Sequence, residues 1–140
     1  MTIPAAKIDG TGRKILVIDD DLAIRVLLQA VLKRMKFEVE LAEDGMAGLE
    51  KLEANGHFDL ILLDLMMPRL NGYEFIEKVT TSIKPKPHII VFTAAGRRGV
   101  DKIPSDAVCS SILKPFDLEK FVDMIGDCLN QSHQPHQAQG

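Results

Sequence analysis

Three adjacent carboxylates, Asp19, Asp20 and Asp21, directly follow a short apolar run at residues 15–18. Adjacent carboxylates repel one another, and each raises the pKa of its neighbour unless a positive charge lies between them. Clustered oxygen ligands suit hard divalent cations such as Mg2+ and Ca2+. An acidic cluster at the carboxyl end of a buried strand therefore predicts a cation site.

Three more polar residues, Asp64, Thr93 and Lys114, each follow another short apolar run further along the chain. A metal-bound carboxylate can also act as a nucleophile, and aspartyl-phosphate formation is an established role for Asp. In phosphoryl transfer a protein mainly positions groups and neutralises the charge that develops on the oxygens. An ammonium and a hydroxyl opposite a cation would suit that task.

The apolar runs alternate with amphipathic segments, which predicts strands that alternate with helices. We expect strands at 14–18, 38–42, 60–63, 88–92 and 110–113, and helices near 24–35, 44–54, 71–83 and 117–129. This order indicates a parallel sheet with helices on both faces, with ligands bound outside the carboxyl ends of the strands. The three polar residues and the acidic cluster should then meet at one edge.

The segment 94–106 is the weak point of this alternation. It contains Gly96, Gly99 and Pro104, all of which oppose a helix. We therefore expect at most a short or irregular fourth helix there.

The composition is that of one soluble globular domain, with 140 residues, 46% hydrophobic residues and a net charge of -3. This charge gives no reason to expect direct binding of nucleic acid or membrane. No apolar run reaches the length of a membrane helix, and the first residues lack the pattern of a secretory signal, so we expect a cytoplasmic protein. Cys109 and Cys128 are expected to be reduced and to act as small apolar residues.

The two ends of the chain differ from the region between them. Residues 1–12 carry Pro4, Gly10 and Gly12 without periodicity and predict a flexible arm. Residues 131–140 predict a disordered polar tail, whose His133 and His136 are expected to be solvated. The domain itself is expected at 13–130.

Four segments of the sequence together resemble one known family, the response-regulator receiver domains of two-component signalling. They are, in chain order, Ile-Leu-Val-Ile-Asp-Asp-Asp, Leu-Leu-Asp-Leu-Met-Met-Pro-Arg-Leu-Asn-Gly, Phe-Thr-Ala and Leu-Lys-Pro-Phe. The resemblance covers about residues 13–130. It implies an α/β fold of three layers, a flavodoxin-like doubly wound sheet of five parallel strands in the order 2-1-3-4-5.

The resemblance also implies a role for each polar residue at the strand ends. Asp64 would accept a phosphoryl group from a sensor histidine kinase or phosphotransfer protein, and would become 4-aspartylphosphate. Thr93 and Lys114 would bind the phosphoryl oxygens, and the Lys114-Pro115 bond would be cis. The change would switch a surface that binds a downstream protein.

The same resemblance implies Mg2+ as the cofactor. Asp20 and Asp64 would be direct ligands of the cation, and Asp19 would reach it through water. The backbone carbonyl of Met66 would complete the protein ligands. Asp21 is expected only to cap the helix that follows.

The sequence departs from the family at the position three residues before the lysine. Receivers usually carry an aromatic switch residue there, whereas this chain has Ser111. The stretch 105–109 also lacks the usual Ala-Gly-Ala turn. The metal site therefore looks complete, while the face that reports phosphorylation looks unusual.

Two alternatives stay open at this point. A phosphorylation-independent binding module on a receiver scaffold would explain Ser111. A haloacid-dehalogenase-like phosphatase would also place Asp19 and Asp21 after its first strand, but the usual Thr or Val is replaced by Ala23.

We expect no enzyme activity beyond self-limited autophosphorylation and autodephosphorylation. We also expect a monomer or weak homodimer without an output domain, unless the chain is a piece of a longer protein.

Overall fold

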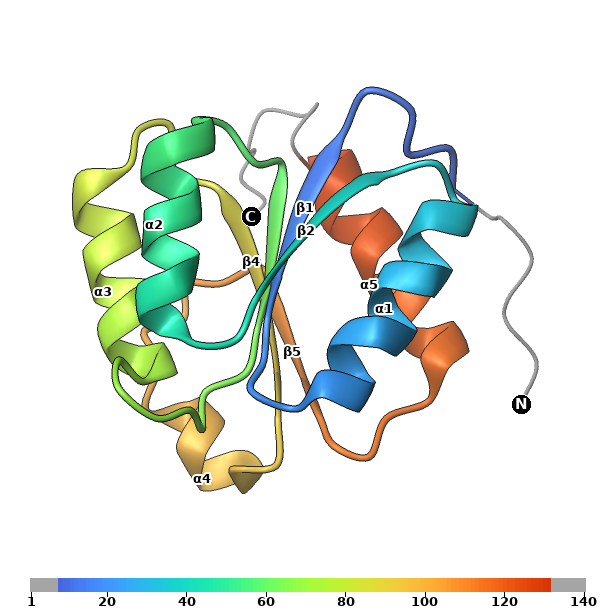
Figure 1. Cartoon of the computed structure of the whole chain (residues 1–140). Helices are drawn as coiled ribbons and strands as arrows, with labels where there is room; N and C mark the ends of the chain where they lie inside the picture. Colours follow the sequence, from blue (N-terminus) through green and yellow to red (C-terminus); the bar gives the residue numbers. More distant parts are fainter. Residues whose placement is uncertain (1–7, 132–140) are drawn as a thin grey trace.

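The computed structural model describes residues 8–131, which form a sheet of five parallel strands with helices on both faces (Figure 1). The strand order is β2-β1-β3-β4-β5, as expected. The strands are β1 (Lys14–Ile18), β2 (Glu38–Ala42), β3 (Leu60–Leu63), β4 (His88–Thr93) and β5 (Ser110–Leu113). All five start within one residue of the positions expected from the sequence.

The helices form the outer two layers of the domain. They are α1 (Leu22–Arg34), α2 (Gly45–Asn55), α3 (Gly72–Ser82), α4 (Gly96–Asp101) and α5 (Leu118–Gln131). Helices α1 and α5 cover one face of the sheet, and α2 and α3 cover the other (Figure 1). The short α4 lies near the carboxyl ends of the strands, at the bottom of that view.

Two hydrophobic clusters fill the space between the layers, because successive strand residues point to opposite faces. Ile15 and Val17 of β1 pack in the cluster that includes α1 and α5. Leu16 and Ile18 of the same strand pack in the cluster that includes α3. The continuous apolar run that predicted a doubly covered strand is therefore explained by burial on both sides.

Polar side chains fix the starts of the helices. The Asp21 carboxylate accepts the N–H of Ala23 at the start of α1, as expected. Asn71 and Glu74 form a reciprocal capping box at the start of α3, which satisfies two backbone donors that lack helical partners. These caps set where the helices after β1 and β3 begin, and so fix the loops that carry the polar strand ends.

Helix α4 is only six residues long, as the glycines and Pro104 predicted. Gly96 has a φ of 82°, a conformation that other residues adopt only at a cost. The helix has no side-chain cap at its start. It is therefore the least supported of the helices in residues 8–131.

The predicted arm lies partly inside the described residues. Ile8 packs against the core, and the Gly10 N–H donates to the Met35 carbonyl at 2.7 Å. A side chain at Gly10 would overlap the ring of Phe37, so the close approach needs a glycine. Residues 8–12 thus lie against the domain. The rest of the predicted arm, and the tail after residue 131 with His133 and His136, fall outside the described part.

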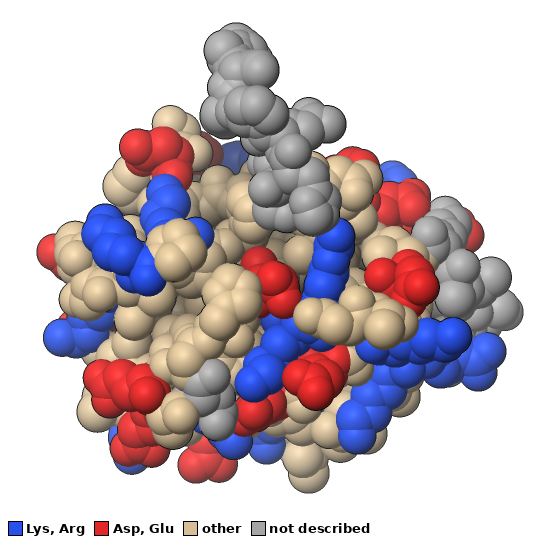
Figure 2. Space-filling model, turned by 90° about the horizontal axis from the view of Figure 1, so that it is seen from above, with Lys and Arg blue, Asp and Glu red and all other residues tan. Residues whose placement is uncertain are grey.

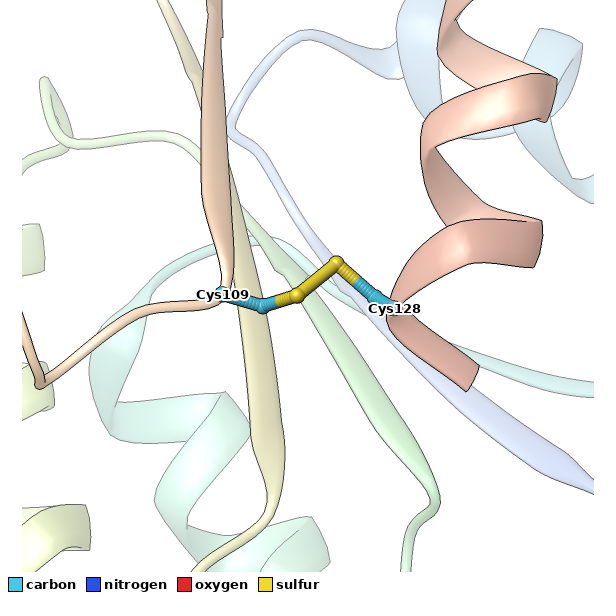
Figure 3. The surroundings of a disulfide bond; sticks show 2 residues. All are labelled: Cys109 and Cys128. Atoms are coloured by element: carbon cyan, nitrogen blue, oxygen red, sulfur yellow. A yellow bond between two sulfur atoms is a disulfide. The ribbon is translucent and has the colours of Figure 1, made fainter. Parts of the chain in front are cut away.

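A disulfide joins Cys109 to Cys128 (Figure 3), which corrects the expectation that both are reduced. Packing of α5 against β5 places their Cα atoms 6.1 Å apart, within the range that a disulfide can bridge. The bond spans a sequence separation of 19. In the chain-entropy model, closing a loop of that size stabilises the fold by about 3 kcal/mol.

The end of the molecule at which the strands begin carries mixed charge. Seen from above the view of Figure 1, basic and acidic side chains are interspersed over this surface (Figure 2). Lys14, for example, pairs with Glu40 at 3.9 Å, and Lys51 pairs with the same carboxylate at 3.4 Å. The ordered polar site lies at the opposite end.

Candidate functional site at the carboxyl edge of the sheet

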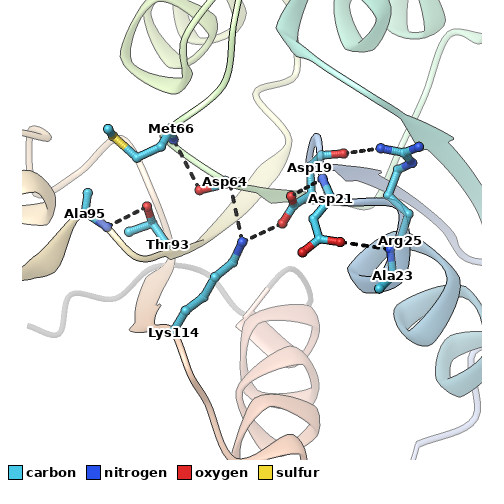
Figure 4. Close-up of polar contacts among 9 residues, drawn as sticks. All are labelled: Asp19, Asp21, Ala23, Arg25, Asp64, Met66, Thr93, Ala95 and Lys114. Atoms are coloured by element: carbon cyan, nitrogen blue, oxygen red, sulfur yellow. Dashed lines mark hydrogen bonds and ion pairs between the residues drawn. The ribbon is translucent and has the colours of Figure 1, made fainter.

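The polar residues predicted from the sequence meet at the carboxyl ends of four strands (Figure 4). Asp19 follows β1, Asp64 follows β3, Thr93 ends β4 and Lys114 follows β5. Backbone hydrogen bonds continue beyond the strands and fix these positions. The Asp64 N–H donates to Ile18 at 3.0 Å, and the Lys114 N–H donates to Thr93 at 2.8 Å. The site is therefore held by the sheet itself.

Three carboxylates form the acidic part of the site. Oxygen atoms of Asp19, Asp20 and Asp64 all lie within 4.8 Å of one another. Asp19 is fully buried and Asp64 is 4% exposed, whereas Asp20 is exposed. Such a set of hard oxygen donors with one open side fits a small divalent cation that keeps several waters.

Lys114 supplies the positive charge of the site. Its Nζ lies 2.7 Å from Asp19 Oδ2 and 3.4 Å from Asp64 Oδ2. It also lies 5.1 Å from the centre of the Phe92 ring. Burial by itself lowers the pKa of Lys114, but the hydrogen bond to Asp19 and the charges of both carboxylates outweigh it, so its pKa is raised. The side chain is therefore a firmly charged ammonium.

Asp19 is the most constrained of the carboxylates. Burial raises its pKa above the ordinary 3.8, and the hydrogen bonds from Lys114 and from the Asp21 N–H offset this only in part. The Asp21 N–H donates to Asp19 Oδ1 at 2.8 Å. Arg25 Nη1 donates to the Asp19 carbonyl at 2.6 Å. The loop after β1 is thus held from both sides.

Asp64 and Thr93 each receive one backbone hydrogen bond from the loop that follows them. The Met66 N–H donates to Asp64 Oδ1 at 3.2 Å, and the Met66 side chain is 58% exposed. The Ala95 N–H donates to Thr93 Oγ1 at 3.1 Å. The hydroxyl of Thr93 is therefore oriented by the same loop that leads into α4.

The Lys114-Pro115 peptide is cis, as expected. A second cis peptide, Lys84-Pro85, was not predicted.

Ser111 lies within β5 and is partly buried, opposite Val91 in the ladder. Three rings, Phe92, Phe116 and Phe121, pack together nearby with centroids 4.8–6.0 Å apart.

Two contacts that hold the site were not expected from the sequence. Arg69 binds Asp44 through Nε at 2.7 Å and Nη2 at 2.6 Å, and so ties the loop after β3 to the start of α2. The Tyr73 hydroxyl donates to the Gly99 carbonyl at 2.8 Å, and so ties α3 to α4. Arg69 does occur within the Met-Pro-Arg-Leu-Asn-Gly segment, but its partner lies 25 residues away and no local pattern indicates it.

A surface pocket of about 790 Å³ lies beside the acidic cluster. Its lining includes Asp20, residues of the loop after β3, and Arg98 and Lys102 of the α4 region. The open side of the carboxylate cluster therefore faces a space large enough to admit a side chain of another protein.

A parallel α/β domain with this acidic cluster, hydroxyl and lysine defines the class of phosphoacceptor signalling domains. The family model for the response regulator receiver domain matches residues 15–126, and the chain belongs to this family. Phosphoryl acceptance is the function of the family, which is a signalling domain rather than a conventional enzyme. The dehalogenase-like alternative is therefore set aside.

Known relatives agree with this membership. The chain is 39% identical over 110 residues to the response regulator MprA of a Mycobacterium species, covering 78% of this chain and 47% of that protein. It is 34% identical over 106 residues to the chemotaxis protein CheY1 of Helicobacter pylori, covering 74% of this chain and 86% of that protein. The chain spans about half the length of several curated response regulators that it matches.

Solved structures show the same fold. A CheY-like receiver domain protein from Methanospirillum hungatei aligns with a TM-score of 0.79 at 29% identity, covering 86% of this chain and 96% of that one. The response regulator TrrA of Thermotoga maritima, solved with Mg2+ and BeF, aligns with a TM-score of 0.74 at 29% identity, covering 83% and 98%. Receiver domains bind Mg2+ at their acidic pocket and interact with kinases and downstream targets.

Within residues 8–131, no helix combines the length and apolar character required to cross a lipid bilayer.

Proposed function

We propose that Asp64 is the phosphoacceptor of this chain. The observation that carries the proposal is the convergence of three carboxylates, the Lys114 ammonium and the Thr93 hydroxyl at one sheet edge. The two oxygens of the Asp64 carboxylate contact different parts of the site. Its Oδ1 faces the Met66 N–H and its Oδ2 faces Lys114.

The reaction forms one bond and breaks one. A carboxylate oxygen of Asp64 attacks the phosphorus of a donor phosphohistidine, and the phosphorus–nitrogen bond breaks as the imidazole leaves with the electron pair. Lys114 lies close enough to Asp64 to neutralise charge on the phosphoryl oxygens. Water then attacks the phosphorus, the bond between the Asp64 oxygen and phosphorus breaks, and inorganic phosphate leaves. The Asp64 carboxylate is restored, which is the self-limited chemistry expected from the sequence.

The acidic cluster fits Mg2+ by its donor chemistry. Asp20 and Asp64 would be direct ligands, Asp19 would bind through water, and the Met66 carbonyl would complete the set. The bound cation would supply positive charge to the phosphoryl oxygens on the side away from Lys114. Asp19 accepts hydrogen bonds from Lys114 and from the Asp21 N–H, and these bonds hold its carboxylate in place. Asp19 would therefore orient a metal-bound water rather than move to bind the cation directly.

Thr93 would pass the change to the surface. Its hydroxyl accepts the Ala95 N–H in this structure, and it would donate its own hydrogen to a phosphoryl oxygen on Asp64, so that the hydroxyl and the Ala95 loop would be drawn toward the site. The Ala95 loop leads directly into α4, which Tyr73 holds through the Gly99 carbonyl. With Ser111 in place of the usual aromatic residue, we infer that α4 and its Tyr73 contact are the output of the switch.

The partners follow from the class of protein. We propose a sensor histidine kinase or phosphotransfer protein as the donor, and a downstream protein that binds near α4. We also propose a cytoplasmic location and a monomeric or weakly dimeric state. Direct binding of nucleic acid is not part of the proposal.

A small phosphodonor tests the site directly. With acetyl phosphate and Mg2+, the intact mass should rise by one phosphoryl group, and hydroxylamine should remove it as expected for an acyl phosphate. Asp64→Asn should give no adduct, while Asp127→Asn, an exposed carboxylate on α5, should behave as the parent. A hydroxylamine-labile adduct that persists in Asp64→Asn would rule out Asp64 as the acceptor.

A phosphorylation-independent binding module is the second candidate function. Ser111 and the six-residue α4 favour it, because both alter the face that usually reports phosphorylation. It predicts equal partner affinity with and without beryllofluoride. A difference in affinity that Asp64→Asn abolishes would decide for the phosphorylation switch.

A further inference from the structure

The Cys109–Cys128 disulfide lies at the end of β5 opposite the phosphoacceptor site. Cys109 directly precedes β5, whose carboxyl end leads to Lys114, and Cys128 lies in the last turns of α5 (Figure 3). The bond therefore encloses β5, the Lys114-Pro115 peptide and most of α5 in one covalent loop. None of the proposed phosphoryl chemistry uses it.

The two sulfur-bearing residues differ in their access to solvent. Cys128 is 1% exposed and packs in the core beside Ile125 and Leu129, whereas Cys109 is partly exposed. Both line a surface groove of about 350 Å³ formed with Ser110 and side chains of α5. The partly exposed Cys109, rather than the buried Cys128, is therefore the half of the disulfide that the groove offers to a small thiol.

The groove also carries charge. Lys120, Asp123 and Asp127 of α5 line it together with the two cysteines and Met124. Two carboxylates against one ammonium make the approach less favourable for an anionic thiol than for a neutral one. The charge of the groove thus favours reduction by neutral thiols over reduction by anionic ones.

We propose that Cys109–Cys128 is a thiol–disulfide exchange site, reached through this groove, that controls whether the last turns of α5 are covalently held to β5. A reductant thiolate attacks the Cys109 sulfur, the disulfide breaks, and Cys128 leaves as a thiolate that takes up a proton. A second reductant thiol then displaces the Cys109 sulfur from the mixed disulfide. Two reductant thiols are oxidised to one disulfide, and two cysteine thiols are formed.

Packing keeps the reduced protein folded. Helix α5 buries Phe121, Val122 and Ile125 against the sheet, all at 0–1% exposure. Loss of the covalent bond leaves these contacts in place. It frees the end of the helix from Cys109, the residue that precedes β5. Reduction should therefore loosen the β5–α5 surface without unfolding the domain.

Native-state reduction is the test. The oxidised protein is incubated without denaturant in dithiothreitol, a neutral dithiol, or in glutathione, an anionic thiol. Aliquots are alkylated and weighed, and hydrogen exchange is followed at residues 124–131 and at 14–18. We expect a reduction rate that increases with thiol concentration, with faster exchange only at 124–131.

Three variants sharpen the result. Asp127→Asn removes a groove carboxylate and should speed reduction by glutathione about two- to fivefold at low ionic strength. Its effect on dithiothreitol should be smaller, because the attacking thiolate of dithiothreitol carries less negative charge. Glu53→Gln, an exposed carboxylate on α2, should change neither rate. Cys128→Ala, which retains a small apolar group in the core, should reproduce the exchange pattern of the reduced protein.

A reduction rate that is independent of thiol concentration and equal to the rate of global unfolding would overturn the proposal. The bond would then be a closed structural crosslink. Equal exchange at 124–131 in the oxidised protein and in Cys128→Ala would overturn it as well, because the bond would not hold the helix end.

Discussion

Lys114 lies closer to Asp19 than to Asp64, with its Nζ at 2.7 Å from the first carboxylate and 3.4 Å from the second. Asp19 is fully buried, so Lys114 is first of all the counter-ion of a buried charge. Its weaker contact with Asp64 leaves the proposed acceptor less tightly held. We therefore expect this ammonium to move toward a phosphoryl group on Asp64 while it keeps its contact with Asp19.

Removing this ammonium should affect stability and metal affinity in opposite directions. Lys114→Met keeps a long apolar side chain beside Phe92 but leaves Asp19 uncompensated, so the free energy of unfolding without Mg2+ should fall by about 2 kcal/mol. Mg2+ should bind about tenfold more tightly, because no ammonium competes for the carboxylates. Urea unfolding and Mg2+ titration measure the two effects. Lys78→Met, on an exposed part of α3, is the control, and weaker Mg2+ binding by Lys114→Met would contradict this account.

Asp19 should leave a signature in the pH dependence of stability. Burial raises its pKa in the folded protein above the ordinary 3.8, so between these two pKa values the folded state binds more protons than the unfolded chain. The contribution of Asp19 to stability is therefore full below 3.8 and is lost as the pH rises through its folded pKa. Denaturant unfolding at a series of pH values, with a chelator present, should show this decrease in the parent protein. Asp19→Asn should lack it, and Glu53→Gln should retain it.

The loop after β3 offers a paired test of charge and backbone conformation. Arg69 has a φ of 65° and holds the buried carboxylate of Asp44, although its own side chain is 59% exposed. Arg69→Ala should cost about 1 kcal/mol, because the ion pair is lost and solvent screens part of its value. Arg69→Gly loses the same pair but relieves the positive φ, so it should be close to neutral. Chemical denaturation of both variants checks the order, and a glycine variant less stable than the alanine variant would contradict it.

Tyr73 should hold α4 in place through its hydroxyl. Tyr73→Phe keeps the ring and removes the 2.8 Å hydrogen bond to the Gly99 carbonyl, at a cost of about 1 kcal/mol. Hydrogen exchange should increase across α4 and leave β1 unchanged. Phosphorylation or beryllofluoride binding should alter hydrogen exchange at α4 in the parent protein. In Tyr73→Phe the same treatment should alter it less.

A control on α3 separates this contact from general loss of hydrogen bonds. Thr81→Ala removes a 2.8 Å bond from an exposed threonine hydroxyl to the Glu77 carbonyl. It should leave exchange at α4 unchanged. If Thr81→Ala and Tyr73→Phe gave the same pattern, Tyr73 would have no special role.

Local patterns were sufficient to predict the strands and most of the site. The run before Asp19 is apolar on both faces because β1 is buried between two helix layers, and that alone identified a central strand. Gly96, Gly99 and Pro104 predicted the short α4 through their poor helix propensity. The close approach of Ala95 and Tyr73 to Gly99 is a separate reason for a glycine there, and the sequence did not indicate it. The polar strand ends then met because parallel strands share one carboxyl edge.

Contacts between elements were the part that the sequence did not predict. The Cys109–Cys128 bond depends on how α5 crosses β5, and the contact of Arg69 with Asp44 depends on how two loops meet. Neither pair has a fixed spacing that would mark it. A general expectation about redox compartment, applied to the two cysteines, led to the wrong prediction of free thiols.

The Cys109–Cys128 disulfide also affects which parts of the domain can move. The terminal helix of a domain is normally where fraying begins. In the oxidised protein the end of α5 is held by a covalent bond, whereas α4 is held by non-covalent contacts such as the hydrogen bond from the Tyr73 hydroxyl to the Gly99 carbonyl. We therefore expect a conformational change that begins at Asp64 to displace α4 more readily than α5. A binding partner should detect movement at α4 and find a fixed reference surface at α5.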